Sequence, residues 1–477
     1  MSADVRPLFL AGTRRETRNT AEVRSPYDDG LVARVAVAGS DEYEEATRAC
    51  VAAAPAVAAL PLHERARILR QVSGALRERR ETFARCIVQE AGKPLRDART
   101  EVDRASMTFD VAAEEARRLP GAGDVVPMDL APHGEGRFAL TRRVPLGPIA
   151  AISPFNFPLN LVAHKLAPAL AAGNPLVLKP ASRTPLSALA LADLMHEAGL
   201  PPGALSVLPM TRETGDRLVQ DDRYRLLTFT GSAEVGWAMK ARAGRKKVVL
   251  ELGGNAAVIV DQGADIAAAA ERTATGGFSY AGQSCISVQR VYVHELAWDA
   301  WLEAFLPLVE GLVVGDPNDE RTAVGPLITT GDVDRIEAWT REAVEGGATV
   351  LCGGSRRSDR IFAPTVLTGV ARHAKVCVEE AFAPVVIVER VASVNEAIDA
   401  VNDSTFGLQA GLFTTSLETT LAAFERLEVG GLLINDVPTY RIDHMPYGGV
   451  KDSGLGREGP RYAIEDMTEL RLLVVRR

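Results

Sequence analysis

Three short stretches of the sequence carry residue types that do covalent chemistry at carbonyl carbons. Cys285 lies in "YAGQSCISVQR", Glu251 follows the apolar run of "VLELGG", and Asn156 lies in the proline-bounded "SPFNFPLN". A cysteine thiolate is a strong nucleophile, a buried carboxylate can act as a general base, and a side-chain amide can donate to an oxyanion. Each of the three residues could therefore act in catalysis.

Each stretch also has a purely structural explanation. Free cysteine is among the most buried residue types, although small polar neighbours such as Ser284 suit a loop that a substrate could approach. Asparagine is common in turns, and a strand-end glutamate can simply be solvated. Taken singly, these motifs leave both explanations open.

The elements around these stretches alternate between short apolar runs and helical patterns. Examples in the first set are "GPIAAIS", "LNLVAHKLAPALAAG", "NPLVLKP" and "RLLTFTG", and a second set runs from "KVVLELGGNAAVIVD" to "GGLLINDV" at 430–437. Such alternation predicts an α/β fold of parallel, doubly wound sheets, with phosphate-bearing ligands at the carboxyl ends of the strands.

The two ends of the chain have other patterns. Apolar residues at helical spacing predict that residues up to about 118 are mostly helical after one short strand, with Ser40 or Asp41 as a helix N-cap. "RFALTRRVP" alternates like a strand that forms an edge or an arm, and "MTELRLLVVRR" predicts a strand that adds to a sheet elsewhere.

Two glycine motifs raise the question of a dinucleotide. In "LLTFTGSAEVG" a strand runs through Thr230, Gly231 and Ser232 into a helix, whose exposed amides could bind a pyrophosphate or merely belong to an ordinary capped helix. "GLGREG" at 454–459 fits G-x-G-x-x-G, but it follows a loop and only 18 residues remain after it. We therefore reject it as a Rossmann fingerprint.

Composition excludes several classes of function. The chain of 477 residues has a net charge of -8 with dispersed basic residues, which argues against nucleic acid and anionic membranes as partners. Its five scattered cysteines and seven separated histidines predict neither a disulfide framework nor a metal site. Without a signal peptide or membrane span, we expect a cytoplasmic protein.

Seven stretches now combine into one resemblance. "SPFNFPL", "VLKPASRTPL", "FTGSAEVG", "LELGGN", "GQSCISVQR", "EEAFAPV" and "MPYGGVKDSGLGREG" occur in the order and spacing of the aldehyde dehydrogenase superfamily, and the resemblance covers nearly the whole chain. It implies two doubly wound α/β domains plus a small β oligomerisation arm, in a homodimer or homotetramer. The implied limits are 1–122, 146–251 and 440–464 for the cofactor domain, 252–439 for the catalytic domain, and 123–145 and 465–477 for the arm.

The resemblance assigns roles to the three reactive residues. Cys285 aligns with the nucleophile, Glu251 with the general base and Asn156 with the oxyanion-stabilising amide. It implies NAD(P)-dependent oxidation of an aldehyde to a carboxylate through a thiohemiacetal and a thioester. Glu251 favours hydrolysis over the CoA-acylating branch, and the intact trio weighs against a non-catalytic protein that retains the fold.

The resemblance also implies a cofactor site. A glutamate that binds the adenine ribose in NAD-preferring members is replaced here by Ser182, so we predict NADP, with NAD tolerated. Glu380 and Phe382 match contacts to the nicotinamide side. The predicted cofactor residues are Ser153, Pro154, Phe155, Lys179, Ala181, Ser182, Thr230, Gly231, Ser232, Val235, Leu252, Glu380 and Phe382.

The substrate is predicted to be a small hydroxylated aldehyde of the lactaldehyde or glyceraldehyde type. Succinate-semialdehyde enzymes often have arginine where this chain has His164, and phosphorylated-aldehyde enzymes often have arginine where it has Ser284. Both classes stay as alternatives. Arg441, and more remotely Arg104, could bind an anionic or hydroxylated end of the substrate, whereas a salt bridge is the other explanation for Arg104.

Overall fold

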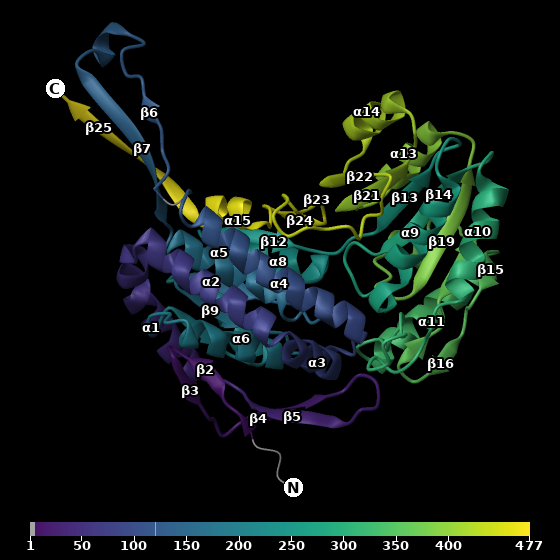
Figure 1. Ribbon diagram of the computed structural model, residues 1–477, viewed down its shortest axis with the longest axis horizontal. Helices are drawn as coiled ribbons and strands as arrows, with labels where there is room; N and C mark the ends of the chain where they lie inside the picture. Colours follow the sequence, from purple (N-terminus) through teal and green to yellow (C-terminus); the bar gives the residue numbers. More distant parts are fainter. Residues whose placement is uncertain (1–4, 120) are drawn as a thin grey trace.

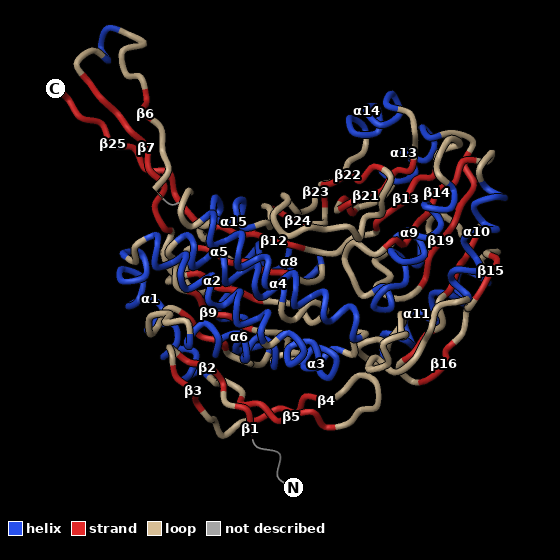
Figure 2. The backbone as a smooth tube through the Cα atoms, in the orientation of Figure 1, coloured by secondary structure: helices blue, strands red, loops and turns tan. Residues whose placement is uncertain are grey.

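The computed structural model describes residues 5–119 and 121–477. Residues 1–4 and 120, which fall in the predicted cofactor domain, lie outside the described residues. Figures 1 and 2 show two α/β bodies side by side, one built mainly from the first half of the chain and one from the second, with a narrow arm projecting from the first body. The C-terminus lies at the arm (Figure 1).

The first body contains an eight-stranded sheet. Its order is β24-β12-β11-β8-β9-β10-β2-β3. The five strands from β12 to β10 are parallel, and β24 and β2 pair antiparallel to them. The strand bounds are β24 (Gly454–Leu455), β12 (Lys247–Glu251), β11 (Leu226–Thr230), β8 (Ile149–Ile152), β9 (Leu176–Lys179), β10 (Leu205–Val207), β2 (Leu8–Leu10) and β3 (Thr13–Arg15).

The second body contains a seven-stranded sheet in the order β15-β18-β19-β14-β13-β21-β22, in which only β15 is antiparallel. The strand bounds are β15 (Thr349–Cys352), β18 (Thr365–Thr368), β19 (Val385–Val391), β14 (Val288–His294), β13 (Ala256–Val260), β21 (Gln409–Phe413) and β22 (Gly431–Ile434). Two small ribbons accompany it, β16 (Arg356–Ser358) with β17 (Ile361–Phe362) and β20 (Phe406–Gly407) with β23 (Val450–Lys451).

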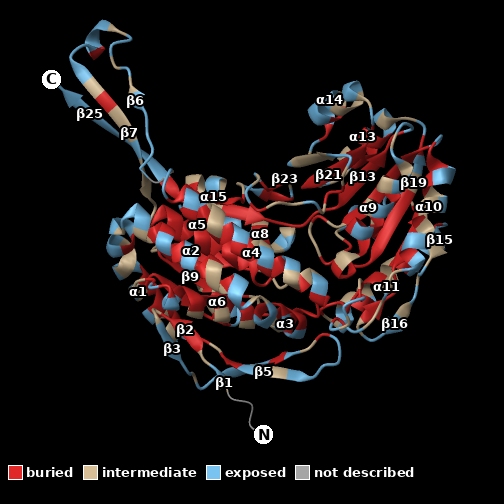
Figure 3. Ribbon diagram, viewed as in Figure 1, coloured by how far each residue is buried: buried red, intermediate tan, exposed pale blue. Residues whose placement is uncertain are grey.

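Helices cover both faces of each sheet, which makes both sheets doubly wound. The first body has α1 (Ser40–Ala59), α2 (Leu62–Glu78), α3 (Arg80–Ala91), α4 (Leu95–Glu115), α5 (Asn160–Ala172), α6 (Leu186–Glu197), α7 (Arg212–Gln220), α8 (Ala233–Arg242) and α15 (Pro460–Asp466). The second has α9 (Ile266–Phe278), η2 (Ser279–Gly282), α10 (Trp298–Glu310), α11 (Thr330–Glu345), α12 (Lys375–Val378), α13 (Val394–Asn402) and α14 (Leu417–Arg426). Figure 3 shows the buried residues concentrated along the strands and on the helix faces that pack on them.

The arm pairs two distant segments. β25 (Thr468–Arg476) runs antiparallel to β7 (Arg137–Pro145) along its whole length, and β6 (Val125–Val126) pairs with the other side of β7. The short η1 (Pro132–Gly134) lies between β6 and β7. The two strands predicted from "RFALTRRVP" and "MTELRLLVVRR" thus pair with each other, while the predicted domain limits stay a prediction.

The N-terminal region differs from the expectation in two details. Before α1 the chain forms β1 (Val5–Arg6), β2, β3, β4 (Thr20–Arg24) and β5 (Leu31–Ala36) rather than one short strand. The N-cap of α1 is Gly39, not Ser40 or Asp41, because the Glu42 carboxylate accepts the Gly39 N–H at 2.7 Å.

Candidate active site

The carboxyl ends of neighbouring parallel strands bring predicted residues to one edge of the first sheet. Ser153 follows β8, Lys179 ends β9, Thr230 ends β11 and Glu251 ends β12. Thr230 lies opposite Glu251 in the register of β11 and β12. Since strand ends of a parallel sheet open onto a common crevice, four residues that are far apart in the sequence share one site.

Cys285 follows a tight turn of the backbone. Tyr280, Ala281 and Gly282 are consecutively left-handed, with φ of 52°, 55° and 70°. The thiol is half-buried, and its sulfur lies 3.0 Å from the phenol oxygen of Tyr447. Burial raises the pKa of the Cys285 thiol to about 12, against the opposing effect of the Tyr447 hydrogen bond. The resting sulfur is therefore a protonated thiol with a hydroxyl donor in place to stabilise its thiolate.

Asn156 lies beside the cysteine loop. Its side chain is buried, and its Nδ2 donates to the carbonyl oxygen of Gln283 at 3.1 Å. The amide has a second N–H, and the backbone N–H of Cys285 has no acceptor among the described residues. Two donors are thus available for an oxygen that develops negative charge next to the sulfur.

Two glycines make room for these groups. A Cβ at Gly254 would lie 2.2 Å from the carbonyl oxygen of Cys285, and a Cβ at Gly448 would lie 2.9 Å from Oε1 of Glu251. Larger residues at either position would displace the nucleophile loop or the carboxylate. The glycines of "LGGN" and "YGGV" therefore serve the packing of the site.

Glu251 is buried, and neither of its carboxylate oxygens has a hydrogen-bond partner in the described part of the chain. Burial raises the pKa of Glu251 well above its usual range, and the neighbouring Glu458 raises it further. The charges of Arg441 and Lys165 oppose this shift. Such a carboxyl can hold a proton at neutral pH and exchange it with a water, as a general base must.

Sequence reasoning missed two charged neighbours of Glu251. The ammonium of Lys165 donates to Thr228 at 3.1 Å and to Thr230 at 2.7 Å, and it lies 3.7 Å from Glu458. Burial opposes ionisation of Glu458, but the charges of Arg441 and Lys165 hold its pKa below the usual range. Of the two carboxyls, Glu458 thus stays ionised while Glu251 takes the proton.

The side chain of Arg441 is buried beside Tyr447, whose hydroxyl contacts the Cys285 thiol. Its guanidinium carbon lies 3.7 Å from the centre of the Tyr447 ring, and its Nη2 donates to Glu458 at 2.9 Å. Its Nε has no acceptor among the described residues. The Tyr447 ring therefore separates the Arg441 guanidinium from the sulfur of Cys285, and the Nε–H of Arg441 remains available as a donor.

The second predicted arginine belongs to the same network. Arg104 on α4 forms a paired contact with Asp443 at 2.9 and 3.1 Å, and Asp443 lies 2.9 Å from Nε2 of His164. Burial lowers the pKa of His164, so its ring is neutral and its Nε2–H donates to the carboxylate. Nη2 of Arg441 lies 3.1 Å from the same Nε2, which cannot accept from it while it donates to Asp443.

The strand-end edge fits a dinucleotide. Gly231 and Ser232 lead from β11 into α8, and Ser232 is an N-cap whose side chain makes no capping bond. A Cβ at Gly231 would lie 2.4 Å from the Phe229 ring, so the close approach of this backbone requires glycine. The Oγ of Ser153 is buried without a partner among the described residues. The N–H of Gly231 is used, since it donates to the Glu251 carbonyl at 3.0 Å, but the first amides of α8 and the orphaned hydroxyl suit a pyrophosphate.

Lys179 and Ser182 lie where the second phosphate of NADP was predicted. Burial lowers the pKa of Lys179, and no carboxylate offsets this effect in the described ranges; its ammonium donates only to the carbonyl of Pro180 there, at 3.4 Å. Ser182 is exposed and lines a cavity of about 110 Å³ with Glu22, Arg24 and Arg183 among others. The ammonium of Lys179 is thus uncompensated, although the cavity next to Ser182 carries both signs of charge.

The nicotinamide-side residues come together from both bodies. The rings of Phe155 and Phe382 lie edge to face, with centres 5.9 Å apart. Glu380 accepts the N–H of Gly254 at 3.0 Å, and burial raises the pKa of Glu380 to about 7. Phe382 has a φ of 47°, a strained value for a residue with a side chain. The remaining predicted residues lie in the same strand-end region: Pro154 after β8, Ala181 after β9, Val235 on α8 and Leu252 after β12.

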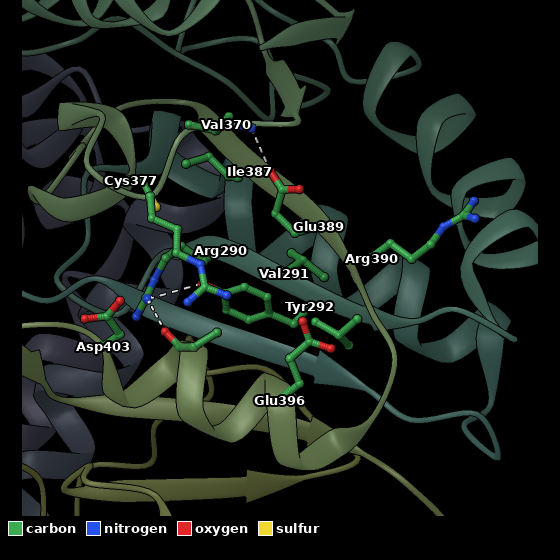
Figure 4. Close-up of a pocket in the computed structure, with 13 residues that line it drawn as sticks. Arg290, Val291, Tyr292, Val370, Cys377, Ile387, Glu389, Arg390, Glu396 and Asp403 are labelled. Carbon is green, nitrogen blue, oxygen red and sulfur yellow. Dashed lines mark hydrogen bonds between the residues drawn. The ribbon is translucent and has the colours of Figure 1, made fainter. Parts of the chain in front are cut away.

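A separate cavity of about 140 Å³ lies in the second body (Figure 4). Its lining contains none of the predicted site residues. Arg290 donates to the carbonyl of Asn255 and to those of Ala400 and Val401 at the C-terminal end of α13, and Glu389 accepts the N–H of Val370 at 2.9 Å. Arg290 and Glu389 are thus paired within the protein, and Arg290 serves as a structural cap of α13.

The described residues show neither a metal-binding cluster nor a membrane-spanning helix. Across residues 5–119 and 121–477, no group of three or more His, Cys, Asp or Glu side chains is placed to hold a metal ion. Within the same ranges, no helix has both the length and the apolar character needed to span a bilayer. The expectation that the protein has no metal stays a prediction.

Comparisons with known proteins give a family. Residues 13–473 match the sequence profile of the Aldehyde dehydrogenase family. The chain is 46% identical to the 3-sulfolactaldehyde dehydrogenase of Priestia aryabhattai over 469 residues, which cover 98% of this chain and 97% of that enzyme.

Solved structures agree. Aldehyde dehydrogenase 21 from Physcomitrella patens, in complex with the reaction product succinate, superposes with a TM-score of 0.97 at 45% identity and covers 100% of this chain and 99% of its own. The glyceraldehyde-3-phosphate dehydrogenase of Methanocaldococcus jannaschii, complexed with NADP, gives a TM-score of 0.92 at 36% identity, over 97% of this chain and 100% of its own.

Proposed function

The chain belongs to the aldehyde dehydrogenase family, and from that premise we propose that it oxidises a short aldehyde with an acidic group at its far end. It is an NAD(P)-dependent aldehyde dehydrogenase, so the predicted family, α/β fold class, reaction and nicotinamide cofactor are confirmed. The substrate, the site residues, the preference for NADP and the oligomer are proposals.

The observation that carries the substrate proposal is the placement of Arg441. Its buried guanidinium packs on Tyr447, whose hydroxyl contacts the sulfur of Cys285, and its Nε has no acceptor among the described residues. A buried arginine with an unused donor suits a carboxylate, sulfonate or phosphate. Because only one ring separates the guanidinium from the sulfur, the aldehyde must be short.

The three relatives support this class. Their names denote sulfolactaldehyde, glyceraldehyde 3-phosphate and the product succinate, all of which carry an acidic group. Sulfolactaldehyde also has the hydroxyl that the sequence predicts. We therefore favour a hydroxylated acid aldehyde of the sulfolactaldehyde type, with succinate semialdehyde as the second candidate because of the succinate complex at 45% identity.

We propose the following roles in the reaction. The Cys285 thiol releases its proton to water, and the Tyr447 hydroxyl stabilises the thiolate. The thiolate attacks the aldehyde carbon, and the carbonyl oxygen becomes an oxyanion that accepts from Asn156 Nδ2 and the Cys285 N–H. Bound NAD(P) supplies the hydride acceptor. Water then attacks the resulting thioester while Glu251 takes its proton, and the carboxylate product leaves as the sulfur becomes a thiolate again.

NADP is the proposed preferred cofactor. Lys179 offers an ammonium without a carboxylate partner in the described ranges, and position 182 itself holds a neutral serine instead of a glutamate. A near-dianionic phosphate on the ribose is accepted better by this pair than by a lysine and a glutamate.

The proposed assembly is a homodimer or homotetramer, built through the arm. β25 is an edge strand of its sheet, and its side chains Leu470, Leu472, Leu473, Val474 and Val475 are 43% to 60% exposed. Exposed apolar side chains on an edge strand suit a second copy of the chain. The cytoplasmic location stays a prediction, which cell fractionation would test.

The substrate proposal is tested with a panel of aldehydes and the variant Arg441→Lys. We expect the purified enzyme to oxidise 3-sulfolactaldehyde or succinate semialdehyde with a kcat/KM at least about tenfold above that for propionaldehyde. Arg441→Lys keeps the charge but loses the planar fork, so this ratio should fall about tenfold. Arg390→Lys, which alters an exposed arginine over Trp298, is the matched control. An unchanged ratio in Arg441→Lys would remove the substrate role of Arg441.

A further inference from the structure

A buried ammonium lies between two aromatic rings behind the active site. Lys93, in the loop between α3 and α4, is fully buried, and its Nζ lies 3.5 Å from the centre of the Phe157 ring and 4.6 Å from the centre of the Tyr280 ring. It also forms a buried ion pair with Glu101. Since burial of a lysine is unfavourable without compensation, all three partners are needed to keep this charge in place.

The two rings belong to the two halves of the proposed reaction centre. Phe157 directly follows Asn156, the proposed oxyanion donor, and Tyr280 precedes the nucleophile Cys285 by five residues. The rings lie edge to face with centres 6.4 Å apart. A single cation therefore contacts both the turn that carries the amide and the loop that carries the sulfur.

The ion pair extends this link to the backbone. Oε1 of Glu101 accepts the N–H of Leu159 at 2.9 Å and of Asn160 at 3.1 Å, at the start of α5. On the other side, the hydroxyl of Tyr280 donates to the carbonyl of Ala91 at 3.1 Å, at the end of α3. The segment from α3 to α4 thus holds the amide turn through Glu101 and the nucleophile loop through Tyr280.

The nucleophile loop needs such support. Tyr280 and Ala281 adopt left-handed backbone conformations that residues with a side chain rarely populate. Conformations of this kind persist only where surrounding contacts hold them. The cation and the Tyr280 hydrogen bond are two of those contacts.

On the basis of the proposed roles of Cys285 and Asn156, we propose that Lys93 is a positioning residue. Its ammonium, held between Phe157 and Tyr280, sets the distance between the oxyanion donor and the nucleophile. This role predicts a lower rate for the step in which the sulfur attacks and hydride leaves. The affinities for aldehyde and cofactor should change little, because Lys93 does not contact the residues proposed to bind them.

The main test is the double variant Lys93→Met/Glu101→Gln. It removes both charges together, and the glutamine oxygen can still accept from Leu159 and Asn160, so neither an unpaired charge nor a lost cap remains. We expect the rate of the pre-steady-state NADPH burst to fall at least about 20-fold, while the aldehyde KM and the NADPH Kd change less than about threefold. Lys240→Met, which removes an exposed lysine over Trp237, is the control.

Two results would overturn the proposal. One is a burst in the double variant within about threefold of the wild-type rate. The other is a parallel loss of burst and cofactor binding, which indicates a general structural role instead.

A second pair of variants serves if the double variant does not fold. Tyr280→Phe keeps the ring and loses the hydroxyl, whereas Tyr280→Leu loses the ring. We expect the burst of the phenylalanine variant to exceed that of the leucine variant at least about fivefold, and equal bursts would overturn the role of the cation. Cys285→Ala separates the two hypotheses, because a burst that survives in this variant refutes the proposed nucleophile whatever Lys93 does.

Discussion

The predicted preference for NADP can be tested by one substitution, Ser182→Glu. Ser182 is exposed and stands three residues after Lys179, whose ammonium has no carboxylate partner in the described part of the chain. A glutamate at this position would place a negative charge against the extra phosphate of NADP, and it would offer a carboxylate to the free ribose hydroxyls of NAD.

The size of the effect follows from the exposure of the site. Two unit charges about 4 Å apart interact by about 1 kcal/mol in water, and the phosphate carries almost two charges, so the repulsion at this exposed position is about 2 kcal/mol. That corresponds to about a 30-fold loss in kcat/KM with NADP. Charged hydrogen bonds to the ribose are worth about 1.5 kcal/mol, or about a tenfold gain with NAD.

Initial rates of NADPH and NADH formation at limiting cofactor measure kcat/KM for NADP and for NAD. The wild type should prefer NADP, and the ratio of the two kcat/KM values should shift about 300-fold in Ser182→Glu. Ser358→Glu adds the same charge on the exposed β16 and should leave the ratio unchanged. A shift in Ser182→Glu of less than about threefold, or a wild type that prefers NAD, would refute the assignment of this position to the phosphate.

Three further predictions concern the reaction, stability and assembly. Glu251→Gln should keep the NADPH burst but turn over slowly. The wild-type hydrolysis rate should rise with pH, because the raised pKa of Glu251 means that its base form becomes abundant only at higher pH. A flat pH profile in single-turnover hydrolysis would contradict this role. Burial raises the pKa of Glu90 from 4.5 to about 8, so the folded state binds the extra proton and its stability should fall as pH rises across that interval. Glu90→Gln should abolish this fall in urea unfolding curves, and an unaltered slope would contradict the linkage. Leu473→Glu on the exposed face of β25 should lower the mass found by light scattering to that of a smaller species, whereas an unchanged mass would exclude this strand from the interface.

The sequence predicts the alternating part of the fold because buried parallel strands have a clear signature. "RLLTFTG" and "NPLVLKP" form β11 and β9, and the residues that follow such strands meet at one edge of the sheet. The strand pattern alone does not bring Glu251 and Thr230 together; the resemblance to the aldehyde dehydrogenase superfamily is what predicts one site for both. Pattern alone did not assign β12 to the first sheet, since its strand is continuous in the sequence with the second set.

Other features depend on contacts that local patterns do not reveal. β4 has mainly exposed residues and too weak an alternation to predict a strand. Tyr447 contacts Cys285 across 162 residues, and Glu458 lies in "GLGREG", which was assessed only as a phosphate motif. Lys93 is a residue type that is almost always exposed, so its burial follows only from the carboxylate and rings that the fold places around it.

The position of Arg441, Tyr447 and Glu458 late in the chain sets an order in time. Cys285 is synthesised more than 150 residues before Tyr447. A nascent chain therefore contains the thiol before it contains the Tyr447 hydroxyl, or Arg441 and Glu458, whose charges shift the pKa of Glu251. These groups dock when the two-residue β24 pairs with the edge of β12 and the glycines of "YGGV" close over the carboxylate. The reactive centre therefore stays incomplete until the chain has been synthesised through Glu458 and β24 can pair with β12.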